Sequence, residues 1–365
     1  MAEEASKKTV VVKKEKKKKK KTKKQRLTKL FFFLLIIGGI AAFLLYFPSC
    51  GILDTMTKGF STRYEFSSQY KASSTFIKED YVDYLSINWR DGDVKVYTHD
   101  ENKISIVETP NETVTEKFMM HYNYQETDKY GHSLLVQYCK SGNHKFGDLK
   151  KDLVVYIPSR EDLHLTIHTY NGDIEFDLGN TFLSKLQVQS NHGSVDGVFD
   201  SANLVYILGS SSKKVKEGYH YNIKQTGEVA RLEQTACQSM NLDLNKINEL
   251  KCGTVFADLK VKVNEVKHFD VSNSRGDTYL YLNESSETNF ENGNIGKLYL
   301  YIKEESNYNI NIEIKEISGI EEEHGKIYNE VATKVTDSNY KTGSGTNKIK
   351  IKTSGNVYLN KLIEE

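Results

Sequence analysis

Three short boxes of the sequence have the residue types of a serine acyl-transfer site. Residues 210–213 read Ser-Ser-Ser-Lys, residues 341–343 read Lys-Thr-Gly, and residues 354–356 read Ser-Gly-Asn. Such a site needs its serine and lysine on one face of a helix, where the amine can activate the hydroxyl. Residues 210–213 instead lie among predicted strands, and the Ser-x-Asn box follows the Lys-Thr-Gly box in the wrong order. We therefore interpret the three boxes as solvated turns.

No spacing of ligating side chains predicts a metal site. His164 and His168 share one face of a predicted strand, but their Cα atoms are roughly 13 Å apart. Asp93, Asp173 and Asp277 each follow a glycine, yet none belongs to a calcium-binding loop or nonapeptide repeat. We expect no metal, no cofactor and no enzymatic activity.

Tyrosines recur in one phase of two consecutive predicted strands. Tyr279 and Tyr281 alternate with leucines, Tyr299 and Tyr301 repeat the pattern, and Tyr358 follows Val357 in the same phase. With the leucines in the core, the tyrosines form an outward ladder, about 4.8 Å apart between neighbouring strands. Their rings combine an apolar face with a polar tip, which suits contacts with glycans or proteins. Tyrosine is also a good strand former, so the ladder has a purely structural interpretation as well.

Short strands must position these side chains. After residue 80, apolar residues alternate with polar ones, as at Leu163, Leu165 and Ile167, and a glycine-containing turn ends each run. The turns recur about every 24 residues, a period typical of repeat architectures. We expect glycine there because the chain reverses through a positive φ. The structural turn glycines are predicted to be Gly92, Gly172, Gly193, Gly253, Gly276 and Gly355.

This recurrence predicts an all-β domain of the β-solenoid or β-helix type, in which each repeat covers the apolar face of its neighbour. A β-sandwich is the alternative, since it also contains short alternating strands. Two segments interrupt the pattern. Residues 111–150 are polar and Tyr-rich and are predicted to form an inserted hairpin, and residues 303–345 are acidic and then rich in Gly and Ser.

One pattern of strand, turn and strand occurs in four closely similar copies. They read IHTYNGDIEF at 167–176, LQVQSNHGSV at 186–195, FDVSNSRGDTYLYL at 269–282 and IKIKTSGNVYL at 349–359. The pattern resembles that of the bacterial putative-adhesin family, surface domains of unknown function, over residues 81–361. The resemblance implies a right-angled or prism-like β-solenoid, which in several members follows an N-terminal transmembrane segment, and no catalytic residue. The 34-residue gap between Gly193 and Gly227 departs from regular members.

An uncharged apolar run of 18 residues extends from Leu30 to Phe47. As a helix it would be roughly 27 Å long, close to the hydrocarbon thickness of a bilayer. We predict a single-pass transmembrane helix over 30–49 rather than a cleaved signal peptide, because the run is long and no small-x-small site follows. A lipoprotein is the alternative, since residues 47–50 read Phe-Pro-Ser-Cys, although Phe47 and Pro48 fit a lipidation site badly.

The charges of the chain are strongly polarised. Residues 1–29 contain 14 Lys and Arg but three acids, whereas the remaining residues carry a net charge of −10. Basic residues beside a spanning segment stay in the cytoplasm, so we predict a disordered cytoplasmic tail over 1–29 that binds anionic lipid headgroups. The tail lacks aromatic residues and groove-reading motifs, which disfavours nucleic-acid binding. Residues 50–80 are predicted to be a juxtamembrane linker and 81–365 the extracytoplasmic domain.

The four cysteines are too sparse for a disulfide framework or a metal site. Cys252 follows Leu250 at strand spacing, which favours a small buried apolar residue. A bridge between Cys237 and Cys252 is the alternative outside the cytoplasm.

Two functional hypotheses follow. The first is a membrane-anchored, extracytoplasmic surface protein that binds or scaffolds in the manner of an adhesin, with a surface protein or glycan as partner. The second is an accessory or sensor protein of a cell-envelope stress response, because some members of the resembling family are similar to such proteins.

The predicted topology can be tested by proteolysis of intact cells. Protease added from outside is expected to digest the β-domain and to spare the tail, because the charges of residues 1–29 hold that tail inside. Epitopes placed at the two ends of the chain would report each part by immunoblot, and a cytoplasmic protein serves as the lysis control. Protection of the β-domain would contradict the topology.

Overall fold

The computed structural model describes residues 69–361, with gaps at 143, 145, 210–218, 237–238, 256, 293–295, 304–305, 316–324, 332–333 and 337. This range is nearly all strand, which confirms the all-β class. The one helical turn in it is a short 3-10 helix, η2 (Glu116–Phe118). The predicted tail and transmembrane helix lie outside the described residues, as does most of the predicted linker. No helix within the described range is long and apolar enough to cross a membrane.

Most strands belong to a first ladder in which long neighbours run parallel. In register, Leu165 pairs with Leu186, Leu186 with Val205, and Val205 with Leu232. In spatial order the first ladder contains β1 (Lys71–Ala72), β6 (His121–Thr127), β7 (Gly131–Gln137), β3 (Tyr84–Asp91), β9 (Leu163–Asn171), β11 (Phe182–His192), β13 (Ser201–Gly209), the second halves of β14 (His220–Ala236), β15 (Ser239–Thr254), β16 (Leu259–Asn273) and β17 (Thr278–Asn292), then β23 (Asn347–Thr353), β19 (Tyr308–Ile314), β22 (Asn339–Lys341) and β21 (Lys334–Thr336).

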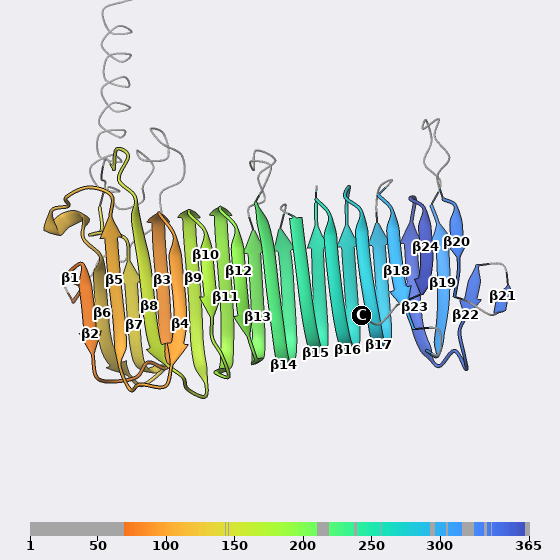
Figure 1. Cartoon of the computed structure of the whole chain (residues 1–365), viewed down its shortest axis with the longest axis horizontal. Helices are drawn as coiled ribbons and strands as arrows, with labels where there is room; N and C mark the ends of the chain where they lie inside the picture. The colour runs from red at the N-terminus through yellow and green to blue at the C-terminus, as the bar shows by residue number, and fades with distance from the viewer. Residues whose placement is uncertain are drawn as a thin grey trace, which may run out of the picture. The chain divides into compact units, whose positions relative to one another are not determined.

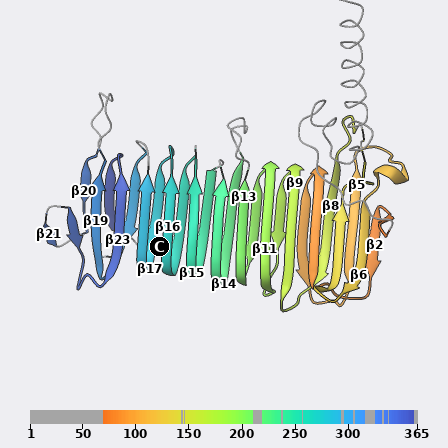
Figure 2. The same cartoon turned by 180° about the vertical axis from the view of Figure 1, so that it is seen from behind.

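A second ladder takes the remaining strands and the first halves of the longest ones. In spatial order it contains β2 (Thr75–Lys78), β5 (Ile104–Pro110), β8 (Lys151–Pro158), β4 (Val94–His99), β10 (Ile174–Asp177), β12 (Val195–Phe199), the first halves of β14 to β17, β18 (Leu298–Ile302), β24 (Val357–Lys361) and β20 (Ile327–Asn329). Within each ladder, the strands from β9 to β17 follow one another in chain order, β9, β11 and β13 in the first and β10 and β12 in the second, before β14 to β17 join both (Figure 1). Figure 2 shows the same order from behind.

One pass of the chain through both ladders adds a strand to each. The in-register partners Tyr221, Met240, Leu259 and Thr278 are 19 residues apart at each step. This repeat is shorter than the period of about 24 residues given by the turn glycines. The step from Val195 to Tyr221 is longer because it contains residues 210–218.

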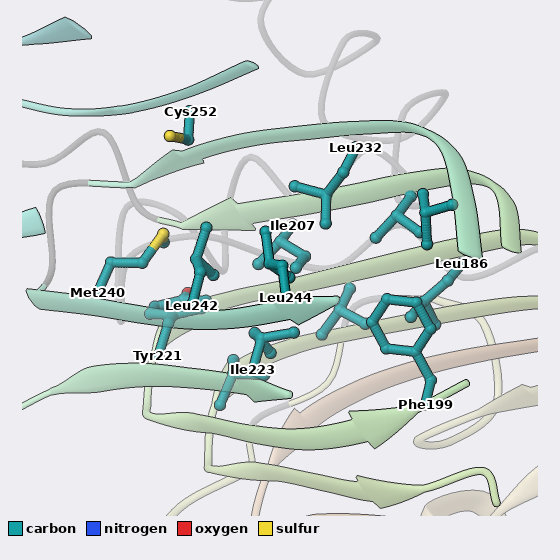
Figure 3. Close-up of a cluster of buried hydrophobic side chains, with 14 of the residues drawn as sticks. Leu186, Phe199, Ile207, Tyr221, Ile223, Leu232, Met240, Leu242, Leu244 and Cys252 are labelled. Atoms are coloured by element: carbon teal, nitrogen blue, oxygen red, sulfur yellow. The ribbon is translucent and has the colours of Figure 1, made fainter. Parts of the chain in front are cut away.

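Apolar side chains of the two ladders fill the layer between them. Alternate residues of each strand point inward, so the strand register stacks apolar residues on apolar residues. Figure 3 shows Leu186, Ile207 and Leu232 of the first ladder beside Phe199 and Leu242 of the second. All five side chains are fully buried. Each such burial contributes about 1.5–3 kcal/mol to folding, which makes this layer the main source of stability.

Antiparallel pairing is confined, within the described range, to the ends of the stack. The hairpin β6–β7 and strand β1 cover one end of the first ladder, β5 and β2 cover the same end of the second, and β22 and β21 cover the far end of the first. Such caps protect the open edges of a parallel stack from pairing with other chains. The first two strands, β1 and β2, belong to these caps, although they lie within residues 50–80, which the sequence predicted to be a linker.

The last two strands lie between strands that precede them in the sequence. β23 pairs with β17 on one side and β19 on the other, while β24 pairs with β18 and β20 (Figure 1). The C-terminal segment of the chain thus inserts one strand into each ladder, between two strands that come earlier in the sequence. The interruption predicted at 303–345 contains the strands that lie beyond this insertion.

Side-chain hydrogen bonds tie successive passes together at the two corners. At one corner, Asn264 Nδ2 donates to Asn245 Oδ1 at 3.1 Å, and Asn283 Nδ2 donates to Asn264 Oδ1. Asn245 Nδ2 in turn donates to the carbonyl oxygen of Thr226 at 2.8 Å. These asparagines are one repeat apart, so side-chain amides of one residue type form hydrogen bonds at the same corner of three successive passes.

At the other corner, the aspartates that follow turn glycines bond to the next pass of the chain. Asp93 Oδ1 accepts the backbone N–H of Asp173 at 2.9 Å, and Asp173 Oδ1 accepts that of Ser194 at 2.7 Å. Asp277 Oδ1 likewise accepts the N–H of Lys297 at 2.8 Å. These carboxylates therefore join neighbouring turns.

Three turn glycines stack directly on one another. A Cβ on Gly92 would lie 2.1 Å from the carbonyl oxygen of Lys151, one on Gly172 would lie 1.9 Å from that of Gly92, and one on Gly193 would lie 2.0 Å from that of Gly172. Gly92 also has a positive φ of 113°, as expected. The close approach of backbone to backbone leaves no room for a side chain at any of the three.

The other predicted turn glycines differ in their surroundings. Gly276 is not among the glycines with positive φ, so our reason for it is wrong, but its Cβ would lie 2.0 Å from the carbonyl oxygen of Ala257. Gly253 lies inside β15, where a Cβ would meet Ser272 Oγ at 2.5 Å. Gly355 lies at the bend between β23 and β24.

Replacement of Gly276 by Val is expected to destabilise the β-domain by more than about 1 kcal/mol, because the new Cβ would overlap a backbone carbonyl that cannot move away alone. The measurement is the denaturation midpoint followed by circular dichroism. Ser274→Val, at an exposed position of the same turn, is the matched control. Equal midpoints for the two variants would show that the close approach at Gly276 is unimportant.

Candidate functional site

Four tyrosine rings stack into a column on the outer face of the second ladder of strands, so the predicted outward row of tyrosines exists. The rings of Tyr279 and Tyr299 are 4.8 Å apart with planes 3° from parallel, and those of Tyr299 and Tyr358 are 4.7 Å and 11° apart. Tyr328 extends the column beyond Tyr358 at 4.6 Å and 5°. The four belong to β17, β18, β24 and β20, which are neighbours in that order.

A shorter second column runs beside the first. The rings of Tyr281 and Tyr301 are 4.4 Å apart and 3° from parallel, and Asn360 follows Tyr301 in register. Because two residues advance a strand by about 6.6–6.8 Å, the two columns lie that far apart.

The inward leucines explain why the tyrosines point out. Leu280, Leu282 and Leu300 are at most 1% exposed, so the alternation along each strand turns the intervening tyrosines to the outer face. Parallel register then places equivalent rings over one another. The sequence pattern revealed Tyr358 but missed Tyr328, because Tyr328 lies in a three-residue strand within an irregular segment.

Stacking decides which parts of the rings a partner can touch. Inside a column each ring face lies against the next ring, so the accessible parts are the ring edges and the hydroxyl groups. Tyr328 ends the described column and is 44% exposed. Burial raises the pKa of Tyr279 and of Tyr299, so both hydroxyls stay protonated and can donate as well as accept hydrogen bonds. The apolar ring face that we expected to contact a partner is therefore covered for most of the ladder.

Lysines precede the tyrosines on the same face. Lys260 and Lys262 of β16 pair in register with Tyr279 and Tyr281. Lys260 Nζ lies 5.5 Å from the centre of the Tyr281 ring, within range of a weak cation–π contact.

The outer face of the first ladder is occupied by ion pairs. Arg231 lies 3.6 Å from Glu249, Lys251 lies 3.1 Å from Glu249, and Lys350 lies 3.6 Å from Glu287. Exposed pairs of this kind contribute about 0–1 kcal/mol each and satisfy one another's charges. An open hollow of about 590 Å³ on this face is lined by similarly mixed charges, including Lys251 and Lys350.

The histidine pair also lies on the first ladder and shows no sign of ligation. Burial lowers the pKa of His164 to about 4 and also lowers that of His168, so both rings are neutral at physiological pH. The His164 ring packs edge-on against Tyr84 at 4.7 Å. Among the residues that the structure describes, no group of three or more His, Cys, Asp or Glu could hold a metal ion.

A buried charged cluster escaped the sequence analysis. Lys151 is 0% exposed, and its Nζ lies 2.7 Å from Glu108 Oε2 and 2.7 Å from the carbonyl oxygen of Phe118, while it also donates to that of Tyr138. The same Nζ lies 4.9 Å from the centre of the Trp89 ring. Burial lowers the pKa of Lys151, and the Glu108 carboxylate opposes that shift.

Glu108 is satisfied from all sides as well. Its Oε2 accepts the backbone N–H of Met120 at 2.9 Å, and its Oε1 accepts the hydroxyl of Ser74 at 2.9 Å. Every donor of the ammonium and both carboxylate oxygens are thus used inside the protein. The pair holds β5, β8 and the segment after η2 together, and it has no surface on which a substrate could bind.

The remaining chemically interesting residues also have structural positions. Thr342 of the Lys-Thr-Gly box is buried and accepts the backbone N–H of Tyr308 at 2.9 Å. The Ser-Ser-Ser-Lys box lies outside the described residues, as does Cys237. Cys252 is a buried free thiol whose pKa is raised by burial, in agreement with the predicted apolar role.

Comparison with solved structures finds distant likenesses, among them two bacterial proteins. A putative adhesin from Bacteroides fragilis aligns over 82% of this chain and 100% of its own, with 10% identity and a TM-score of 0.30. A putative cell adhesion protein from Clostridium sporogenes aligns over 79% of this chain and 99% of its own, with 11% identity and a TM-score of 0.17. No family model and no curated protein matches the sequence. At these scores neither likeness supports an argument about function.

Removal of the buried ammonium is expected to destabilise the β-domain strongly. Lys151→Met leaves the Glu108 carboxylate buried without its cation, which costs about 3–5 kcal/mol. Lys150→Met, at the exposed neighbouring position, is the control, and the denaturation midpoint by circular dichroism is the readout. Adding Glu108→Gln to Lys151→Met should restore part of the loss. A midpoint equal to that of the control would contradict the structural role of the pair.

Proposed function

We propose that this chain is a membrane-anchored, extracytoplasmic binding or scaffolding protein, adhesin-like and without catalytic activity. Its β-domain is a two-sided β-solenoid that presents the tyrosine columns to a partner at the cell surface. The parallel ladders with their 19-residue register support the solenoid.

One observation carries the proposed binding role. Six tyrosines of four strands, far apart in the sequence, form two flat columns on a single outer face: Tyr279, Tyr281, Tyr299, Tyr301, Tyr328 and Tyr358. Tyrosine is enriched at interfaces because it combines apolar area, a polar tip and few rotatable bonds. On the outer face of the first ladder, the described residues form no comparable column of four stacked tyrosines, and several of its charged side chains pair with one another.

The anchoring part of the proposal comes from the sequence. The apolar run from Leu30 to Phe47 has the length of a membrane span, and the basic residues before it favour a cytoplasmic tail. Anionic lipid headgroups are the proposed partners of that tail, at about 1 kcal/mol per basic residue near the surface.

The binding role is tested with the double variant Tyr281→Ser, Tyr301→Ser. Binding of the purified protein to cell envelopes should fall at least about tenfold, because two central contact residues are lost. The matched control is Lys224→Ser, Asp243→Ser, another in-register outward pair on the same ladder.

Both variants must keep the parental circular dichroism spectrum, since stacked cross-strand pairs also stabilise the sheet by a few tenths to about 1 kcal/mol. Unchanged envelope binding by the folded tyrosine variant would return the columns to a purely structural role.

A further inference from the structure

The geometry of the tyrosine columns restricts the chemistry of a partner further than the presence of tyrosine alone does. Sugar rings bind aromatic residues mainly by lying flat on an exposed ring face. Tyr299 and Tyr358 cannot offer such a face, because each ring is stacked on two neighbours at 4.6–4.8 Å, and Tyr279 is stacked against Tyr299 on one side. What the three rings present along their edges is a row of hydroxyl groups, which can donate and accept hydrogen bonds.

The row has a fixed direction and a fixed spacing. It crosses the strands, and its members repeat once per strand, at about 4.7–4.9 Å. A bound peptide strand repeats its outward groups every 6.6–6.8 Å or so, and therefore falls out of step with the row after one ring. A second β-sheet has the right spacing, but sheets pack through interdigitating apolar side chains, which this row of hydroxyls does not provide.

The neighbourhood of the row is polar and nearly balanced in charge. Lys260 and Lys262 lie before it, whereas the carboxylates of Asp258 and Asp277 are close enough to contribute to the raised pKa of Tyr279. Asn360 continues the second column with an amide in place of a ring. A strongly charged polymer of either sign gains little here.

We propose, on the basis of the binding role above, that the partner is an uncharged linear polysaccharide lying along the columns, across the strands. Its sugar units advance by nearly one strand spacing, so each unit brings ring or hydroxyl oxygens to a successive tyrosine hydroxyl. The contacts are hydrogen bonds to ring edges, and affinity accumulates over the length of the row.

The experiment measures calorimetric binding of the full chain in detergent to cellohexaose and chitohexaose, with the corresponding disaccharides for comparison. At least one hexasaccharide is expected to bind about tenfold more tightly than its disaccharide. The variant Tyr279→Phe, Tyr299→Phe, Tyr358→Phe keeps the stacked rings and removes three hydroxyls, so it is expected to lose about tenfold or more in affinity. Tyr206→Phe, on the outer face of the first ladder, is the control.

The outcomes separate this inference from the binding role itself. Absence of hexasaccharide binding by the parent chain, or full affinity in the triple Phe variant, would overturn the polysaccharide inference. Envelope binding that is lost in the Tyr281→Ser, Tyr301→Ser variant, but that neither oligosaccharide inhibits in the parent chain, would also overturn the polysaccharide inference. That result would instead support a protein partner at the same columns. The single variant Tyr299→Phe repeats the test should the triple variant fold poorly.

Discussion

Backbone hydrogen bonding between parallel strands is the constraint on which the rest of the structure depends. It holds each pass of the chain in register with the pass before it, 19 residues earlier in the central region. Equivalent side chains are thereby stacked, whatever their type. Stacked leucines form the core, Asn245, Asn264 and Asn283 form a hydrogen-bonded corner, and stacked tyrosines form the outer columns. One geometrical rule therefore produces stability, turn structure and the candidate binding surface together.

The same constraint explains where the fold leaves no room for a side chain. Turns of successive passes approach so closely that Gly92, Gly172 and Gly193 touch through their backbones. The ends of the stack must be covered, because an open parallel edge would pair with another chain. At the N-terminal end, antiparallel strands cover the edge, and the buried pair of Lys151 and Glu108 holds them in place. That pair favours one arrangement of the cap, since any other would leave a buried charge without its partner.

The sequence was sufficient wherever the side-chain period was regular. Alternation around Leu165 and Leu280 predicted strands and inward faces, and the phase of Tyr279 and Tyr299 predicted the column. It could not predict the place of β23 and β24, because the order of strands in space depends on which edge is free when they pair. The pair of Glu108 and Lys151 was also missed, since its 43-residue separation spans two irregular segments. The alternation of residue types also does not predict that the ring faces in the columns are covered, because this depends on how side chains of neighbouring strands pack.

The central claim is that neighbouring strands pair in parallel at a 19-residue interval, and engineered disulfides test it most directly. In a background without the four native cysteines, the outward positions Asp243, Lys262 and Tyr281 lie on consecutive strands of the second ladder. In-register positions on adjacent strands meet the distance requirement of a disulfide, whereas positions two strands apart do not. Mild oxidation followed by peptide mass mapping should give crosslinks in Asp243→Cys, Lys262→Cys and in Lys262→Cys, Tyr281→Cys, but none in Asp243→Cys, Tyr281→Cys. A crosslink in the last variant, or none in the first two, would contradict the stacked parallel arrangement.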